Sequence, residues 1–334
     1  MSDIFIRIFN PDINSKTGQL LPPNSPRRGT PEWREFERLI LSSLESLGYC
    51  HDFSQPDKCI FLQKETPLEE DDISNQNDYK RMYVHKCKRD VPQGDLFYMQ
   101  MHMRQLFTID SNGWGADHSG NELFNHTDLP VEETRNFSNH LSDSLLSKGE
   151  SKLPQPQVTD ITPERFILVP TQTPRDYTIK YHSPITVKYF IESIVSWANE
   201  SENHVCFKLH PCGRDNDLVN AVEVSRYVHL IEGNIHELIK RSNGLFVINS
   251  GTGFESLIHG KPVATFGACD YNKVTHNADI RRLDEARNFI YSYKQEWKDL
   301  AYKFVWWYWN CHAYDVNSPN TPSRLTEYLR GALK

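Results

Sequence analysis

The stretch that decides the fold of this chain is Val247-Ile248-Asn249-Ser250-Gly251-Thr252-Gly253-Phe254-Glu255. Its apolar start predicts the end of a buried strand, and its small polar residues predict a turn that opens into a helix. Earlier in the chain, Phe207-Lys208-Leu209-His210-Pro211 ends a second apolar run. A cation, an imidazole and the free N–H groups of a helix start would then meet at the carboxyl edge of a parallel sheet. This pattern predicts a phosphate-and-ribose site.

Apolar runs and helical periods alternate on both sides of these two stretches. We predict strands at 166–170, 205–209, 228–231, 245–248 and 262–266, and helices at 185–199, 218–225, 234–240 and 253–259. Such alternation is typical of an α/β fold with a doubly wound parallel sheet.

The first half of the chain carries weaker signals of the same kind. We predict strands at 4–9, 59–62, 83–86, 96–103 and 106–110 and a helix at 31–47, and we interpret the polar residues 121–158 as the approach to a linker. The expected domains are an amino-terminal domain at 1–160 and a second domain at 161–280. Helices at 281–334 are expected to pack back across the domains.

Composition excludes several classes of protein. The 334 residues carry a formal net charge of -7, which argues against general affinity for nucleic acid. The seven cysteines form no C-x-x-C pair, and no zinc-binding histidine spacing occurs, so we expect a reduced chain with no metal or other cofactor. Without a signal-peptide pattern or a run long enough to cross a bilayer, we expect a cytoplasmic protein.

An aromatic segment near the carboxyl end, residues 302–309, leaves two interpretations open. Packing inside the protein is favoured. The alternative is peripheral contact with the inner membrane, because Trp and Tyr favour membrane interfaces.

Two groups of residues are candidates for binding an anionic ligand. Lys208 and His210 share one face of their strand, although a strand can also end in this way without a function. Ser250 or Thr252 can cap the following helix, and Glu255 can accept hydrogen bonds from ribose hydroxyls. The alternative for Glu255 is a structural one, in which it forms a capping box with Thr252.

Carboxylates supply the candidate catalysts. Asp176 follows Arg175 in the loop after the strand at 166–170, where it can act as a nucleophile or a base or merely cap the next element. Asp110 lies in an Asp-Ser-Asn-Gly turn, where a turn-forming role is favoured over catalysis. The Asp-x-Asp spacing at 215–217 and the acidic run at 69–72 are interpreted as solvated surface.

Several of these motifs occur in an order that resembles a known family. They are Val169-Pro170-x-Gln172-x-x-x-Asp176, then Lys208-x-His210-Pro211, then Asn249-Ser250-x-Thr252-Gly253-x-Glu255, and finally Gly260-Lys261-Pro262-Val263 and Gly267-x-x-x-Tyr271. Over about residues 165–275 the chain resembles the bacterial capsule polysaccharide synthesis family. Its characterised members are β-Kdo transferases that use CMP-Kdo.

The resemblance implies a GT-B architecture, in which two Rossmann-like domains face a cleft. The domain at 1–160 then binds the acceptor, and the domain at 161–280 holds the nucleotide-sugar donor. The resemblance also implies that His210 contacts and protonates the departing phosphate, and that Asp176 is the nucleophile of a retaining reaction. A general-base role for Asp176 in an inverting reaction is the alternative. The implied catalytic residues are Asp176, His210 and Asp110, and the implied donor-binding residues are Gln172, Arg175, Lys208, His210, Pro211, Asn249, Ser250, Gly251, Thr252, Gly253, Glu255 and Tyr271.

The resemblance therefore predicts a metal-independent transfer of Kdo from CMP-Kdo to a glycan or lipid-linked saccharide acceptor in surface polysaccharide synthesis. Transfer of another CMP-activated acid sugar, or of a sugar from a nucleoside-diphosphate donor, stays open. So does a non-catalytic subunit that binds a nucleotide sugar. An epimerase of the same architecture is less favoured, because the pair of Lys208 and His210 suits a monophosphate.

Overall fold

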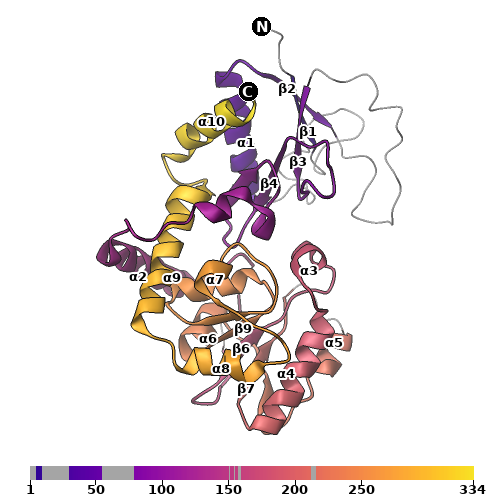
Figure 1. Ribbon diagram of the computed structural model, residues 1–334, viewed down its shortest axis with the longest axis vertical. Coiled ribbons are helices and arrows are strands. Elements are labelled where there is room, and N and C mark those ends of the chain that lie inside the picture. The colour runs from indigo at the N-terminus through magenta and orange to yellow at the C-terminus, as the bar shows by residue number, and fades with distance from the viewer. Residues whose placement is uncertain are drawn as a thin grey trace. The chain divides into compact units, whose positions relative to one another are not determined.

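A computed structural model describes residues 5–9, 30–54, 79–149, 151–153, 155–156, 159–211 and 216–334. Within it the chain forms two compact units, Met1–Gly120 with His312–Lys334, and Asn121–Cys311 (Figure 1). The strand predicted at 59–62, the acidic run at 69–72 and Asp215 lie outside the described residues.

The first unit contains a six-stranded sheet in the order β12-β5-β4-β3-β1-β2. Its strands are β1 (Phe5–Phe9), β2 (Cys50–Ser54), β3 (Tyr79–Val84), β4 (Leu96–Gln100), β5 (Leu106–Asp110) and β12 (Tyr314–Asp315). The strands β1 to β4 run parallel to one another, whereas β5 runs antiparallel to both of its neighbours. The predicted strands at 4–9, 83–86, 96–103 and 106–110 are therefore confirmed, although the second begins earlier and the third ends earlier than predicted.

The helices of the first unit cover this sheet with apolar faces. Helix α1 (Pro31–Ser46) begins with Pro at its first turn and confirms the predicted helix at 31–47. Its buried Phe36 stacks on Phe107 of β5 with ring centroids 4.4 Å apart. Helix α10 (Thr321–Ala332) adds Leu325 and Leu329 to the same core.

The second unit contains a fully parallel sheet in the order β11-β10-β9-β6-β7-β8. Its strands are β6 (Ile167–Pro170), β7 (Val205–Lys208), β8 (Val228–Leu230), β9 (Gly244–Val247), β10 (Val263–Thr265) and β11 (His276–Asn277). The chain runs outward from β6 through β7 to β8 and then returns to β9 on the other side of β6. The switch point of the sheet therefore lies between β6 and β9, where ligands bind in folds of this kind.

Helices cover both faces of this sheet, as the predicted doubly wound arrangement requires. The helices of this unit are α2 (Val131–Lys148), α3 (Tyr177–His182), α4 (Val187–Ser201), α5 (Asn216–Ala221), α6 (Ile235–Arg241), α7 (Gly251–Ile258), α8 (Leu283–Tyr291) and α9 (Gln295–Trp307). Alternate strand residues such as Val169 and Phe207 pack with α4 and α8, and Leu168 and Cys206 point to the opposite face. Because both faces are covered, the central strands β6 and β9 consist of buried residues without a charged side chain.

The structure differs from the sequence prediction at helix α2, which lies in the stretch interpreted as the approach to a linker. The buried positions of this helix include Thr134, Ser138, Ser142 and Leu145, so its inner face is built mainly from hydroxyl residues. Its ends carry acidic residues in the first turn and a left-handed glycine cap at Gly149. The buried residues therefore recur at helical spacing, but most of them are not apolar, so the helix was not predicted.

The division into units also differs from the expected domains. The first unit ends at Gly120 and not at residue 160, because α2 packs against α7 and α9 of the second unit. The carboxyl-terminal residues 281–334 are shared between the units. Helices α8 and α9 belong to the second, and β12 and α10 complete the first.

The aromatic segment at 302–309 packs inside the second unit. Its buried members are Tyr302, Phe304, Val305, Trp307, Tyr308 and Trp309. Phe304 contacts the rings of Phe124 and Phe254, with centroids 5.2 and 6.4 Å away. The favoured interpretation, packing, is confirmed for these side chains.

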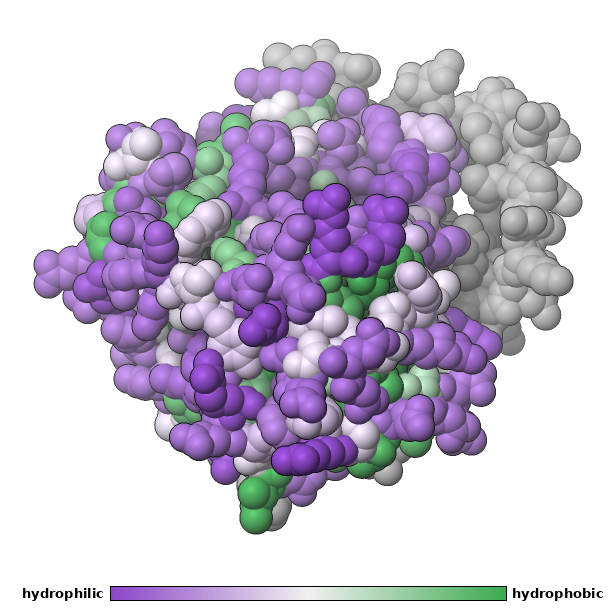
Figure 2. All heavy atoms as spheres, turned by 60° about the horizontal axis from the view of Figure 1, so that its bottom comes forward, coloured by the Kyte–Doolittle hydropathy of each residue, from purple (hydrophilic) through white to green (hydrophobic). Residues whose placement is uncertain are grey.

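No helix in the described part of the chain is both long and apolar enough to cross a bilayer. The face of the molecule in Figure 2 is largely hydrophilic.

A buried histidine pair makes the second unit sensitive to acid. His259 Nδ1 lies 2.8 Å from Ser142 Oγ, and its Nε2 lies 2.9 Å from Nδ1 of His236. Burial lowers the pKa of His259 to about 3, and His236, Lys240 and Lys261 act in the same direction. Because the folded pKa lies below the unfolded value, this group stabilises the fold above about pH 6.5, and its contribution falls as the pH drops toward 3.

We therefore expect His259→Gln to flatten the acid side of the stability profile. At pH 4.5 the wild type should have lost about 2.7 kcal/mol through this residue, which is two pH units at about 1.36 kcal/mol each. Thermal denaturation of both proteins from pH 7.5 to 4.5 measures the difference. Parallel stability profiles for the two proteins would show that the pKa of His259 is the same in the folded and unfolded states.

Candidate functional site

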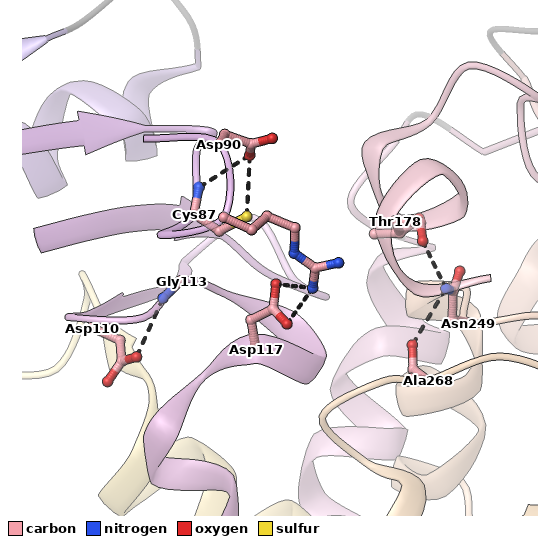
Figure 3. A network of polar contacts seen from close by, with 9 residues as sticks. Cys87, Asp90, Asp110, Gly113, Asp117, Thr178, Asn249 and Ala268 are labelled. Atoms are coloured by element: carbon pink, nitrogen blue, oxygen red, sulfur yellow. Dashed lines mark hydrogen bonds and ion pairs between the residues drawn. The ribbon is translucent and has the colours of Figure 1, made fainter. Parts of the chain in front are cut away.

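The sequence-predicted residues of the second unit gather at the carboxyl edge of its sheet. The loops after β6, β7 and β9 bring together Asp176, His210 and the Asn249 turn, at the switch point of the sheet. Figure 3 shows Asn249 between Thr178 of α3 and Ala268, which follows β10. The strand order places these loops side by side although they are far apart in the sequence.

Asp176 is the N-cap of α3. Its Oδ1 atom accepts hydrogen bonds from the backbone nitrogen and the hydroxyl group of Thr178, both at 2.9 Å. In the described part of the chain, no hydrogen bond reaches the other carboxylate oxygen, Oδ2. The side chain is half-buried. The capping interpretation is therefore confirmed, and the cap still leaves one oxygen for chemistry.

Lys208 is the last residue of β7, and His210 lies two residues later in the chain. Lys208 is buried, and this burial lowers the pKa of its ammonium group, although Glu232 and Glu255 partly oppose the shift. The backbone nitrogen of His210 donates to Thr171 Oγ1 at 3.2 Å. Burial also lowers the pKa of the His210 imidazole; the charge of Asp176 opposes this change, and Lys208 and Lys152 add to it.

Lys152 is a further cation of this site that the sequence analysis did not identify. It lies just after α2, where its neighbour Ser151 donates a hydrogen bond to the carboxylate of Glu255. Burial lowers the pKa of Lys152, while the carboxylates of Asp176 and Glu255 oppose the shift. A lone lysine in a polar stretch gives no sequence signal, so only the fold reveals its position.

Glu255 is almost fully buried on α7. The N-cap of this helix is Ser250, whose side chain accepts from the backbone nitrogen of Thr252. A capping box between Thr252 and Glu255 would need Thr252 as the N-cap residue. Because Ser250 holds that position, the capping box is a wrong alternative. The ribose role of Glu255 stays a prediction.

The remaining predicted donor residues differ in their exposure. Arg175 and Pro211 are exposed, and Ser250, Gly251 and Thr252 are partly exposed. By contrast, Gln172, Asn249, Gly253 and Tyr271 are buried. The roles of all nine residues in donor binding stay predictions.

Tyr271 explains why position 253 is a glycine. The hydroxyl group of the fully buried Tyr271 donates to the carbonyl oxygen of Ser250. A methyl group added at Gly253 would lie closer than van der Waals contact to that hydroxyl oxygen. The absence of a side chain here serves the packing of Tyr271 against the start of α7.

We therefore expect Gly253→Ala to destabilise the fold by roughly 1–3 kcal/mol through overpacking. Adding Tyr271→Phe should recover part of this loss, because it removes the clashing oxygen. Chemical denaturation of the two single variants and the double variant measures the coupling. Additive effects would contradict the proposed clash.

Asp110 lies in the first unit at the end of β5. Its Oδ1 accepts from the backbone nitrogens of Asn112, Gly113 and Ser119, and its Oδ2 accepts from the Ser119 hydroxyl. Figure 3 shows the contact with Gly113. Burial would raise the pKa of Asp110, but the nearby His118 and these hydrogen bonds outweigh it and lower the pKa. The turn-forming role of Asp110 is confirmed, and its catalytic role stays a prediction.

Comparisons with known proteins agree with this arrangement. Residues 147–287 match the family model described as capsule polysaccharide biosynthesis protein. The matched segment contains the sheet strands from β6 to β11 and every candidate residue of the second unit, Lys152 included.

One curated relative and two solved structures give further likenesses. Protein FixF of Sinorhizobium fredii (strain NBRC 101917 / NGR234) is 29% identical over 174 residues, which are 49% of this chain and 42% of FixF. The chain thus spans less than half the length of that relative.

The β-Kdo 2,7 transferase of Thermosulfurimonas dismutans KpsC aligns over 99% of this chain and 100% of its own, with a TM-score of 0.53 and 14% identity. The β-Kdo 2,4 transferase of the same protein aligns over 90% of both chains, with a TM-score of 0.49 and 15% identity. The first of these likenesses supports the fold, two Rossmann-like units of the GT-B class.

Proposed function

We propose that this chain is a glycosyltransferase that moves Kdo from CMP-Kdo to a glycan or lipid-linked saccharide acceptor, with retention of configuration. The observation that carries this proposal is the combination of one half-buried carboxylate, Asp176, with Lys152, Lys208 and His210 at the switch point of a parallel sheet. The match of residues 147–287 to the family model of capsule polysaccharide biosynthesis proteins supports it.

The charges of the site match the proposed donor. CMP-Kdo carries a phosphodiester and a carboxylate, and the site offers two ammonium groups, an imidazole and the amino end of α7. Burial lowers the pKa of Lys152, Lys208 and His210, which means that their positive charges are incompletely solvated in the free protein. An anion bound beside them would compensate for the lost solvation. An anionic ligand would reverse these shifts and gain binding energy by doing so.

The proposed reaction uses two displacements. Oδ2 of Asp176 attacks the anomeric carbon while the bond from that carbon to the phosphate oxygen breaks, and CMP leaves with the bonding electrons and a proton from His210. The neutral imidazole then takes the proton of the acceptor hydroxyl, whose oxygen displaces Asp176. The carboxylate also stabilises the oxocarbenium-like transition states of both steps.

Lys152 provides a prediction on donor recognition. We expect Lys152→Met to raise the KM for CMP-Kdo by roughly 10-fold to 100-fold, the cost of one charge-assisted contact. If Lys152 contacts the sugar carboxylate, the affinity for CMP itself should change much less. Lys148→Met, on the last turn of α2, is the matched control. Equal KM values for wild type and Lys152→Met would remove Lys152 from the donor site.

Release of CMP from CMP-Kdo in the presence of saccharide acceptors tests the proposed function. A transferase should release CMP and give a sugar product with the β configuration, with and without EDTA. Turnover of a nucleoside-diphosphate sugar in place of CMP-Kdo would assign a different donor. Binding of the donor without turnover, over a full set of acceptors, would favour a non-catalytic subunit.

A further inference from the structure

A continuous series of hydrogen bonds links the switch point of the sheet to Asp176. The Gln172 Nε2 atom donates to Asn249 Oδ1 at 2.9 Å and to Thr178 Oγ1 at 3.0 Å. The Thr178 hydroxyl in turn donates to Asp176 Oδ1 at 2.9 Å. The series therefore runs from the loop after β9, through the loop after β6, to the first turn of α3.

Asn249 fixes the other end of this series. Its backbone nitrogen donates to Gln172 Oε1 at 3.2 Å, so the Gln172 and Asn249 groups pair reciprocally. Its Nδ2 atom donates to the carbonyl oxygens of Thr178 at 2.9 Å and Ala268 at 3.3 Å. Both amide side chains are about 95% buried. Every polar atom of the two side chains is thus engaged inside the protein, which leaves them little capacity to bind a donor.

The geometry at Asp176 shows what this series achieves. Both hydrogen bonds from Thr178 converge on Oδ1, which restrains the position of that oxygen and leaves Oδ2 without a hydrogen bond from the described residues. A nucleophile or base needs its reactive oxygen held within a narrow range of positions, because misplacement by about 1 Å can cost roughly 100-fold in rate. The buried amides would supply that rigidity.

We propose that Thr178 is a positioning residue for Asp176, and that Gln172 and Asn249 hold Thr178 in place instead of binding the donor. This inference rests on the proposed function for its kinetic consequence, but the positioning itself is a property of the fold. Donor-binding residues would change KM and CMP affinity when they are replaced. Positioning residues would change kcat and leave CMP affinity as it is.

The test compares Thr178→Val, which loses the hydroxyl, with Thr178→Ser, which keeps it. Thr186→Val is the matched control, because Thr186 caps α4 through its hydroxyl and has no link to Asp176. We expect Thr178→Val to lower kcat by roughly 10-fold to 100-fold, with the KM for CMP-Kdo and the Kd for CMP within twofold of wild type. Thr178→Ser and Thr186→Val should keep kcat near the wild-type value.

Gln172→Met provides a second route to the same result and should also lower kcat without changing the Kd for CMP. A kcat for Thr178→Val equal to that of Thr178→Ser would overturn the inference, as would a large rise in the Kd for CMP in Gln172→Met.

If the wild type turns over no CMP-sugar, the proposed function is wrong. Amide hydrogen exchange then still tests the positioning role, because it needs no enzymatic activity. Amide hydrogen exchange of residues 177–182 should be several-fold faster in Thr178→Val than in Thr178→Ser, because the cap of α3 is loosened. Equal exchange in the two variants would overturn the positioning role whatever the substrate is.

Discussion

Asp176→Asn is expected to abolish sugar transfer while the protein stays folded. Asparagine caps helices as well as aspartate does, so its side-chain oxygen can still accept the two hydrogen bonds from Thr178. The amide cannot act as a nucleophile or a base. We therefore expect kcat to fall by about 10³-fold or more, with a melting temperature close to that of the wild type.

Initial rates of CMP release at saturating CMP-Kdo measure this loss, and calorimetry with CMP confirms that the variant still binds nucleotide. Asp160→Asn is the matched control, because the exposed Asp160 also accepts one backbone N–H, from Glu232 at 2.7 Å. A folded Asp176→Asn protein with near-normal kcat would remove Asp176 from the mechanism. In the retaining reaction, mass spectrometry of the wild type mixed with CMP-Kdo should detect a sugar ester on Asp176.

His210→Ala is expected to have the second largest effect, a loss of roughly 10² to 10⁴ in kcat, the range for removal of a general acid. Burial holds the pKa of the imidazole below its ordinary value of 6.5 in the free protein. The phosphate of a bound donor would raise it again, because an opposite charge favours the protonated form. Binding of CMP near pH 6.5 should therefore take up a proton.

The pH profiles follow from the same shift. A general acid must be protonated, so the rate should fall as the pH rises through the pKa of His210. The fall in kcat/KM reports the free protein and should come at a lower pH than the fall in kcat, which reports the bound complex. His210→Ala should lose both the alkaline fall and the proton uptake. His204→Ala, at the amino end of the same strand, is the control. Proton uptake that persists in His210→Ala would assign it to another group.

The alternation of apolar runs made the second unit predictable from its sequence. Residues such as Val205, Phe207 and Phe246 are buried on a parallel sheet and give continuous apolar signals. The turn at 249–255 was predictable for the same reason, since it follows such a run. Helix α2 was not, because its buried face uses Thr134, Ser138 and Ser142 in place of apolar residues.

The candidate site was predictable only in part. Lys208 and His210 lie at the carboxyl end of β7 and Asp176 lies in the loop after β6, so the parallel topology brings them to one edge. Lys152 reaches the site through the fold of the chain after α2, and no local pattern marks it. The reciprocal pairing of Gln172 with Asn249 depends on β6 and β9 being neighbours, which the sequence separation of 77 residues conceals.

Calorimetric titration with CMP, CDP, UDP and GDP, each with and without EDTA, tests the central claim most directly. We predict selective binding of CMP that EDTA does not change, because the site offers Lys152, Lys208 and His210 in place of a metal. Preference for a diphosphate, dependence on a divalent cation, or no binding of any nucleotide would contradict the assignment of a CMP-sugar donor.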